Sequence, residues 1–313
     1  MSDTFHPREA VKALLKGAEP SRPLFLPIVF SLGARVENVT RRAFLGNATK
    51  IANSLRQVRT HLRADAMTCY FDPLVEAEAL GGEVCWSADE SAAELHWPGT
   101  TPESAPEDIA TQGRLPVAAE VIRRLKAVVR DGTLLMAGIT GPLTLSAMLG
   151  DGLEATSGAI GAIVRAYLEA GADVILFHER MGAVPGEARE EGLAQLATAA
   201  NIIRFYEALP VALFTGPGAA AIAGEAVRGE WGGVTCAEWE TARAGAREEQ
   251  RCGMALPMEA LTGDDSAFAD FEQRLQHVIW EARPAVVTTS DDLPAMADTK
   301  RLARVAATLV QTP

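Results

Sequence analysis

The segment that decides the fold is AIGAIVRAYLEAGADVILFHE, residues 159–179. Its first part, Ala159 to Ala170, places apolar residues at the three- and four-residue spacing of an amphipathic helix. Gly171 ends the helical pattern, and Asp173 to Glu179 then form a short apolar run typical of a buried parallel strand. This helix followed by a strand predicts a parallel sheet with helices packed on its outer face.

The same alternation recurs from about residue 25 to the end of the chain. We expect eight strands, at Phe25 to Phe30, Ala66 to Phe71, Thr133 to Ile139, Asp173 to Glu179, Pro210 to Thr215, Gly233 to Cys236, Arg251 to Leu256 and Pro284 to Ser290. Helical patterns include Pro7 to Lys16, Ala118 to Arg130, Ala159 to Ala170, Gly192 to Ala208, Ala267 to Glu281 and Thr299 to Val310. A β-hairpin, Glu83 to Trp86 and Glu94 to Trp97, is predicted as an insertion after the second strand.

Eight strands alternating with helices predict an α/β fold, a single (β/α)8 TIM barrel formed by residues 1–313. An open doubly wound sheet is the alternative. It usually has fewer strands and a glycine-rich dinucleotide turn after the first one, which SLGARVEN after Phe30 does not supply.

Charge and cysteine content limit the function classes. The chain has 29 Lys and Arg against 41 Asp and Glu, a net charge of −12, which argues against nucleic-acid or anionic membrane partners. The four cysteines form no CxxC pair, and the polar N-terminus MSDTFHPREAVKALLKG has no apolar signal core. No run reaches the ~18 apolar residues that a membrane span requires. We therefore expect a cytoplasmic protein that acts on a small molecule.

Reactive groups of a parallel barrel lie at the carboxyl ends of its strands, where the βα loops converge. We expect catalytic roles for Asp72, His178 and Glu179, and substrate contacts from Arg35, Thr140, Arg180, Thr215 and Asp291. Ser31 also follows the first strand, and Ser290 and Asp292 flank Asp291 after the eighth.

Two of these sites leave alternatives open. Asp72 precedes Pro73, so it is a general acid, an acceptor for a substrate N–H, or a turn former. Alternation in the fourth strand puts Glu179 and His178 on opposite faces, and we expect Glu179 to point toward the barrel axis. The alternative is a structural Glu179 that pairs with Arg180 at the barrel rim.

The order of six segments is similar to that in the superfamily of uroporphyrinogen decarboxylase and the corrinoid-linked methyltransferases. The segments are PREAVKALLKGAEPSRPLFLP, AMTCYFDPLVEAEALGGEV, GITGPLTLSAMLGDG, YLEAGADVILFHE, RCGMALP and DDLPAMADTKRLARVA, which span nearly the whole chain. The resemblance implies a (β/α)8 barrel, and it places Asp72 at the position of the catalytic aspartate of the decarboxylases.

Other landmarks of the decarboxylases are replaced. Their Arg-Gln-Ala-Gly-Arg-Tyr segment reads SLGARVENV here, so only Arg35 stands in for two carboxylate-binding arginines. Their active-site tyrosine falls at Met148, and their C-terminal histidine falls near Ser290 or Asp291. A substrate with many carboxylates is poorly matched by an acidic chain without the arginine pair.

The GITGPLTL segment looks more like the methyltransferase branch. Thiol methyltransferases of that branch hold zinc through a His-x-Cys pair and a later Cys. Phe214 and Asp291 occupy those places here, so we expect no zinc.

The resemblance therefore implies methyl transfer from a small methylated or methoxylated substrate to a corrinoid (cobalamin) on a separate partner protein. Glu179 or Asp72 would protonate the leaving group. The alternatives are decarboxylation of a carboxylated tetrapyrrole or of a smaller ring, and a non-catalytic tetrapyrrole-binding protein. The resemblance also implies a homodimer.

Overall fold

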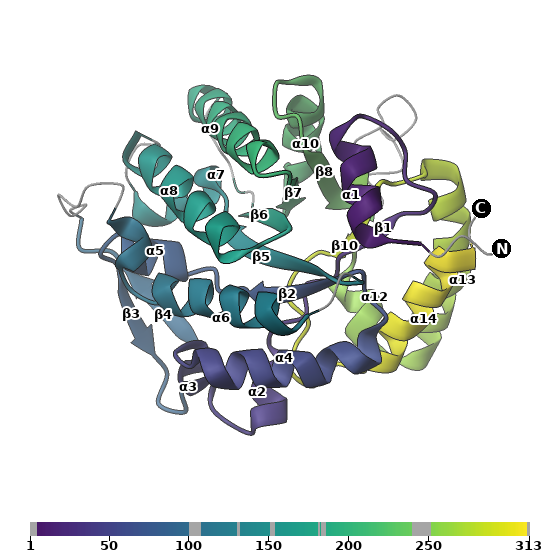
Figure 1. Ribbon diagram of the computed structural model, residues 1–313, viewed down its shortest axis with the longest axis horizontal. Helices are drawn as coiled ribbons and strands as arrows, with labels where there is room; N and C mark the ends of the chain where they lie inside the picture. Colours follow the sequence, from purple (N-terminus) through teal and green to yellow (C-terminus); the bar gives the residue numbers. More distant parts are fainter. Residues whose placement is uncertain are drawn as a thin grey trace.

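The computed structural model describes residues 5–99, 108–129, 132–150, 154–180, 182, 186–239 and 252–311 (Figure 1). Eight parallel strands form one sheet in the order β1-β10-β9-β8-β7-β6-β5-β2. Their bounds are Leu24–Phe25 for β1, Ala66–Tyr70 for β2, Leu134–Thr140 for β5, Val174–Arg180 for β6, Leu209–Thr215 for β7, Val234–Glu238 for β8, Cys252–Leu256 for β9 and Val286–Thr289 for β10. The sheet curves into a nearly closed barrel, which confirms the expected (β/α)8 fold.

Helices surround the sheet on its outer side (Figure 1). They are α1 Pro7–Leu15, α2 Leu32–Glu37, α3 Arg41–Leu45, α4 Ala48–Leu62, α5 Val75–Ala79, the short 3-10 helix η1 Ile109–Thr111, α6 Leu115–Val128, α7 Pro142–Leu149, α8 Glu154–Ala170, α9 Gly186–Phe205, α10 Ala219–Arg228, α12 Met258–Thr262, α13 Asp265–Ala282 and α14 Thr299–Gln311. No helix in the described parts of the chain is long and apolar enough to cross a membrane.

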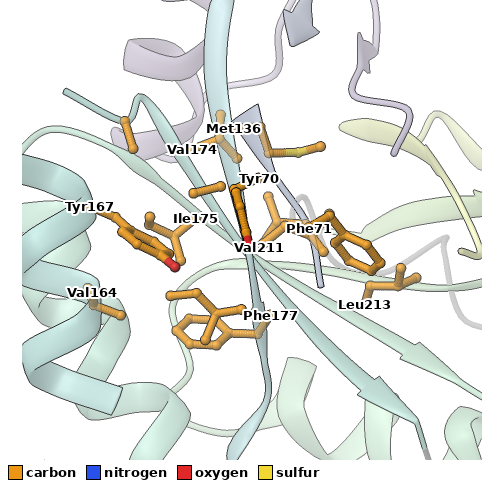
Figure 2. Packing of buried hydrophobic residues seen from close by; sticks show 14 of the residues in the cluster. Tyr70, Phe71, Met136, Val164, Tyr167, Val174, Ile175, Phe177, Val211 and Leu213 are labelled. Carbon is orange, nitrogen blue, oxygen red and sulfur yellow. The ribbon is translucent and has the colours of Figure 1, made fainter. Parts of the chain in front are cut away.

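The central strands have apolar side chains on both faces. All seven residues of β5 are buried, as are the first six of β6, because the helices cover one face and the opposite strands cover the other. Figure 2 shows Val164 and Tyr167 of α8 on one side of β6, and Phe71 and Leu213 on the other. The apolar runs of the sequence are therefore core strands buried on two sides.

The hairpin insertion is present between α5 and η1. Strands β3, Glu83–Trp86, and β4, Ala93–His96, pair in antiparallel fashion and form a separate two-stranded sheet. Their side chains alternate between exposed and half-buried positions, as expected for a hairpin with one face in water.

The first strand is shorter than the predicted Phe25 to Phe30. Pro27 has no N–H to donate to the ladder. Beyond Pro27, side-chain oxygens accept the hydrogen bonds of the backbone N–H groups. The Ile28 N–H donates to Thr289 Oγ1 at 3.0 Å, and the Phe30 N–H donates to Asp292 Oδ1 at 2.7 Å. The segment stays buried, although it is no longer a regular strand.

Side chains of Asp65 and Thr68 close the barrel between β1 and β2. The Phe25 N–H donates to Asp65 Oδ2 at 2.8 Å, and the Asp65 N–H donates to the Phe25 carbonyl at 2.9 Å. Thr68 Oγ1 accepts from the Val29 N–H at 3.2 Å and donates to the Pro27 carbonyl at 3.1 Å. These bonds satisfy buried backbone groups where strand pairing is missing.

Candidate functional site

A cleft of ≈ 1110 Å³ opens where the chain leaves β1, β2 and β10. Apolar side chains form much of its wall, among them Phe30, Phe44, Leu45, Phe71, Met148 and Met296. Its charged lining residues are Arg35, Arg41, Arg180, Asp72, Asp89, Asp291 and Asp292. The cleft thus brings together four of the predicted site residues, Arg35, Asp72, Arg180 and Asp291, and combines an apolar surface with charged groups of both signs.

Asp72 is held by two arginines at the end of β2. Its Oδ2 accepts a hydrogen bond from Arg114 Nη1, and Arg41 Nη2 lies 3.6 Å from its Oδ1. Arg114 also donates through Nε to Glu78 Oε2 at 2.7 Å, which orients the guanidinium. The Asp72 side chain is only 4% exposed, so this carboxylate has lost most of its water and depends on the ion pairs.

Sequence reasoning missed both arginine partners of Asp72. Arg41 begins the short helix α3, and Arg114 precedes α6. Neither lies at a fixed spacing from Asp72 or at the end of a strand, so no local pattern in the sequence marks them.

The mouth of the cleft carries a second ion pair. Arg180, at the end of β6, donates through Nη2 to both Asp291 oxygens at 3.0 and 2.9 Å. These two predicted substrate-binding residues therefore form an ion pair with each other. Arg35 lines the same cleft, and within the described residues its guanidinium has no hydrogen bond or ion pair.

His178 and Thr140 lie deeper. A small second cavity is lined by both of these residues together with Asp72 and Arg180. Thr140 Oγ1 donates to the Pro73 carbonyl at 3.0 Å, and His178 Nε2 lies 3.1 Å from Thr215 Oγ1. Burial, together with the nearby Arg180, lowers the pKa of His178 to about 4, so the imidazole is neutral at pH 7.

Glu179 points the other way, and the expectation that it faces the barrel axis is wrong. Its Oε1 accepts from the Leu143 N–H at 3.1 Å, and its Oε2 accepts from the Thr144 N–H at 2.8 Å and from the Thr144 hydroxyl at 2.7 Å. The carboxyl is fully buried against the start of α7, and burial raises its pKa to about 7. The alternative Glu179–Arg180 pair is not found either, because Arg180 pairs with Asp291.

Asp292 is fixed to the end of the segment that follows β1. Its Oδ1 accepts from the Phe30 N–H at 2.7 Å, and its Oδ2 accepts from the Ser31 N–H at 3.0 Å and from the Ser31 hydroxyl at 2.5 Å. Burial raises the pKa of Asp292 to about 6, against the opposing effect of these donors. The sequence groups Asp292 with Ser290 and Asp291 after the eighth strand but does not indicate which of them faces the cleft.

The donors of a zinc site do not come together around the cleft. Phe214 is buried within β7, and Asp291 is paired with Arg180. Among the residues that the structure describes, no three His, Cys, Asp or Glu side chains form a group that fits a metal ion. The side chains at these places do not fit the zinc of the thiol methyltransferases.

The fold and the cleft define a (β/α)8 barrel with a large cleft at the carboxyl ends of its strands. Residues 6–157 match the sequence profile of the uroporphyrinogen decarboxylase (URO-D) family. The resemblance to the URO-D superfamily is confirmed, with the sequence match lying in the N-terminal half of the chain.

Solved structures extend the likeness in fold to the whole chain. A methyltransferase from Methanosarcina mazei is similar over 98% of this chain and 99% of its own, with a TM-score of 0.79 and 16% identity. A D-allulose 3-epimerase from Methylomonas sp., solved with D-allulose, is similar over 94% of this chain and 98% of its own, with a TM-score of 0.51 and 8% identity. No curated protein matches the sequence. At these identities the structural matches show the shared barrel.

Proposed function

We propose that the protein transfers a methyl group from a small methylated or methoxylated molecule to a corrinoid carried by a separate protein. The observation that supports this most strongly is the cleft itself. It is large, mainly apolar, and open at the end of the barrel where both a substrate and a carrier can approach. The similarity in fold to a methyltransferase along nearly the full length of both chains supports the same reaction class.

The residues of the cleft suit a ring-shaped substrate. Phe30, Phe44 and Phe71 form part of the buried apolar wall of the cleft, and the exposed Met296 adds apolar surface against which a ring can pack. Arg35 is free to bind an anionic substituent, since its guanidinium has no other partner among the described residues. The substrate class that fits is therefore a methoxylated aromatic acid.

Methyl transfer needs two further functions at the substrate. The carrier supplies the electron pair that takes the methyl group, and the protein must hold the ring and stabilise the oxygen that is left behind. Asp72, held by Arg114, and Arg41 both line the cleft and would orient the substrate's polar groups. His178 is neutral, and together with Thr140 it lines the small second cavity that shares Asp72 and Arg180 with the cleft, so it adds no charge beside them.

Decarboxylation of a small carboxylated ring is the second candidate, because one specific observation favours it. The unpaired Arg35 and the carboxylate of Asp72 line the same cleft, so a substrate carboxylate could be held by the arginine while Asp72 stabilises a positively charged ring. The URO-D match over residues 6–157 includes both residues.

The test is a turnover screen with purified protein, cob(I)alamin as methyl acceptor, and paired panels of methoxylated and carboxylated aromatic rings. The proposal expects a demethylated product that forms only with cob(I)alamin present and is lost in Asp72→Asn. Glu259→Gln, an exposed change on α12, should leave the rate unchanged. Release of CO2 without any acceptor would favour the decarboxylase. Saturable tetrapyrrole binding without turnover would favour the non-catalytic protein.

A further inference from the structure

The cleft holds four carboxyl groups, and three of them are committed to other partners. Asp72 is bound by Arg114, and Asp291 is bound by Arg180. Asp89 accepts hydrogen bonds from the hydroxyls of Ser87 and Ser91, and these bonds lower its pKa to about 2. Each of these three carboxyl groups is therefore already engaged by a partner within the protein.

Asp292 is the fourth, and its surroundings are different. Its hydrogen-bond donors are all neutral, namely two backbone N–H groups and the Ser31 hydroxyl, and no cation among the described residues forms an ion pair with it. Burial raises its pKa to about 6, against the opposing effects of these donors and of Arg41, which lies beyond ion-pair distance. Glu179 also has a raised pKa, but it is buried on the far side of β6 and does not line the cleft.

Ser31 connects this carboxyl to the substrate space. Both Ser31 and Asp292 line the cleft, and their side-chain oxygens are 2.5 Å apart. The backbone bonds from Phe30 and Ser31 fix the carboxyl in place, so that the hydroxyl and carboxyl are held as one unit where the segments after β1 and after β10 meet. Fixed geometry of this kind is what a general acid requires.

We infer that Asp292, acting through the hydroxyl of Ser31, is the general acid that protonates the leaving oxygen of the substrate. The methyl C–O bond breaks as the carrier's electron pair takes the methyl group, and the electrons of that bond stay on the oxygen. Ser31 gives its proton to this oxygen and receives the Asp292 proton. The substrate leaves as an alcohol or phenol, and Asp292 regains a proton from water. This role rests on the proposed methyl transfer.

The first arm of the test needs no substrate. A ¹³C NMR titration of the aspartate carboxyl groups, with Asp292→Asn used to assign the signal, should show Asp292 titrating well above an ordinary aspartate. Ser31→Ala removes the hydroxyl donor to the ionised form and should move the titration to still higher pH. An Asp292 carboxyl that is ionised across the whole range from pH 5 to pH 8 would overturn the inference, whatever the enzyme's activity.

The second arm measures turnover and its pH profile with a methoxylated substrate and cob(I)alamin. Loss of a general acid typically costs ~10²–10⁴-fold in rate, so kcat of Asp292→Asn should fall by that order at pH 6 while KM changes much less. The wild-type rate should decline as pH rises through 6, and the variant should lose that decline. Ser31→Ala should show a comparable loss, because the proton reaches the leaving oxygen through the Ser31 hydroxyl. Asp298→Asn, an exposed change outside the cleft lining, is the matched control.

The experiments distinguish a failure of the role of Asp292 from a failure of the proposed methyl transfer. Wild-type turnover with unchanged kcat and pH profile in Asp292→Asn would overturn the role of Asp292 and leave methyl transfer standing. No methyl transfer by the wild type, with Asp292 titrating as expected, would overturn the proposed function and the acid's role with it. Folding of each variant is checked by its urea midpoint. The amide that Asp292→Asn introduces keeps an oxygen that can accept from the Phe30 N–H, so the variant should retain the native fold.

Discussion

Asp72 shows how much a single residue of this cleft depends on remote parts of the chain. Its carboxylate is almost fully buried, and its main partner Arg114 is 14% exposed. Removing one member of a buried ion pair leaves the other charge without compensation, at a typical cost of about 3–5 kcal/mol.

Arg114→Met should therefore lower the free energy of unfolding by several kcal/mol. Arg123→Met on α6, the helix that Arg114 precedes, is the matched control, because the Arg123 side chain is 55% exposed and pairs with Glu120 at the surface. Exposed pairs contribute only about 0–1 kcal/mol. Urea unfolding of both variants checks the prediction, and equal losses would contradict the ion-pair account.

Glu76 is a buried acid whose protonation is linked to folding. It lies on α5, four residues after Asp72, and both its carboxyl oxygens are buried without a hydrogen-bond partner in the described parts of the chain. Burial raises its pKa to about 8. The native state thus binds a proton that the unfolded chain has already released, so stability is greatest below the ordinary glutamate pKa and is lost as pH rises toward 8.

Between pH 7 and pH 8 the free energy of unfolding should fall by about 1 kcal/mol from this group alone, since one pKa unit corresponds to about 1.4 kcal/mol. His178, Glu179 and Asp292 contribute less in this window because their pKa values are about 4, 7 and 6. Glu76→Gln should flatten the slope, whereas the exposed Glu259→Gln should keep it. Urea unfolding at several pH values measures the slope, and an unchanged slope in Glu76→Gln would refute the assignment.

Among the elements, β6 shows what alternation can and cannot predict. The sequence correctly places His178 and Glu179 on opposite faces, because side chains alternate in any strand. It cannot say which face is inward when both faces are apolar, as they are in a buried parallel strand. The contact of Glu179 with α7 decides the question, and no spacing within β6 shows that contact.

The same contact of Glu179 with α7 explains why the residue before α7, Gly141, has no side chain. A Cβ at this position would lie 2.2 Å from Glu179 Cδ, well inside van der Waals distance. Gly141→Ala should destabilise the protein by roughly 1–3 kcal/mol, the usual cost of overpacking. Gly132→Ala, where a Cβ would meet nothing within 4 Å, should change stability by less than about 0.5 kcal/mol. Thermal unfolding of the pair gives the comparison, and matching midpoints would rule out the clash.

The closure between β1 and β2 depends on the hydroxyl of Thr68. Thr68→Val keeps the shape of the side chain but leaves the Val29 N–H and the Pro27 carbonyl unpaired in a buried place. Each unsatisfied buried group costs about 1–3 kcal/mol, so the variant should lose at least about 2 kcal/mol, with faster hydrogen exchange at Val29. Thr60→Val, on the exposed side of α4, is the control. Protection at Val29 equal to that of the wild type would show that the barrel closes by other means.

For the molecule as a whole, the alternation of strands and helices was enough to predict the barrel and its hairpin. Seven of the eight barrel strands are predicted closely, and only β1 is much shorter, because Pro27 interrupts it. The candidate site is predicted in outline, since strand ends converge in any parallel barrel. The partners of its charged side chains could not be predicted from the sequence. Arg41, Arg114 and Asp292 make their contacts with segments that lie far away in the chain.

In the proposed reaction, a methyl group leaves a substrate bound in this cleft. The most direct test of this reaction is to follow the ¹³C label of a methoxylated aromatic acid incubated with the protein and cob(I)alamin. The label should move to cobalamin, a phenol should be released in equal amount, and both products should be lost in Asp72→Asn. Label that stays on the ring, while a carboxylated ring loses CO2 in the same cleft, would contradict methyl transfer and establish the decarboxylase instead.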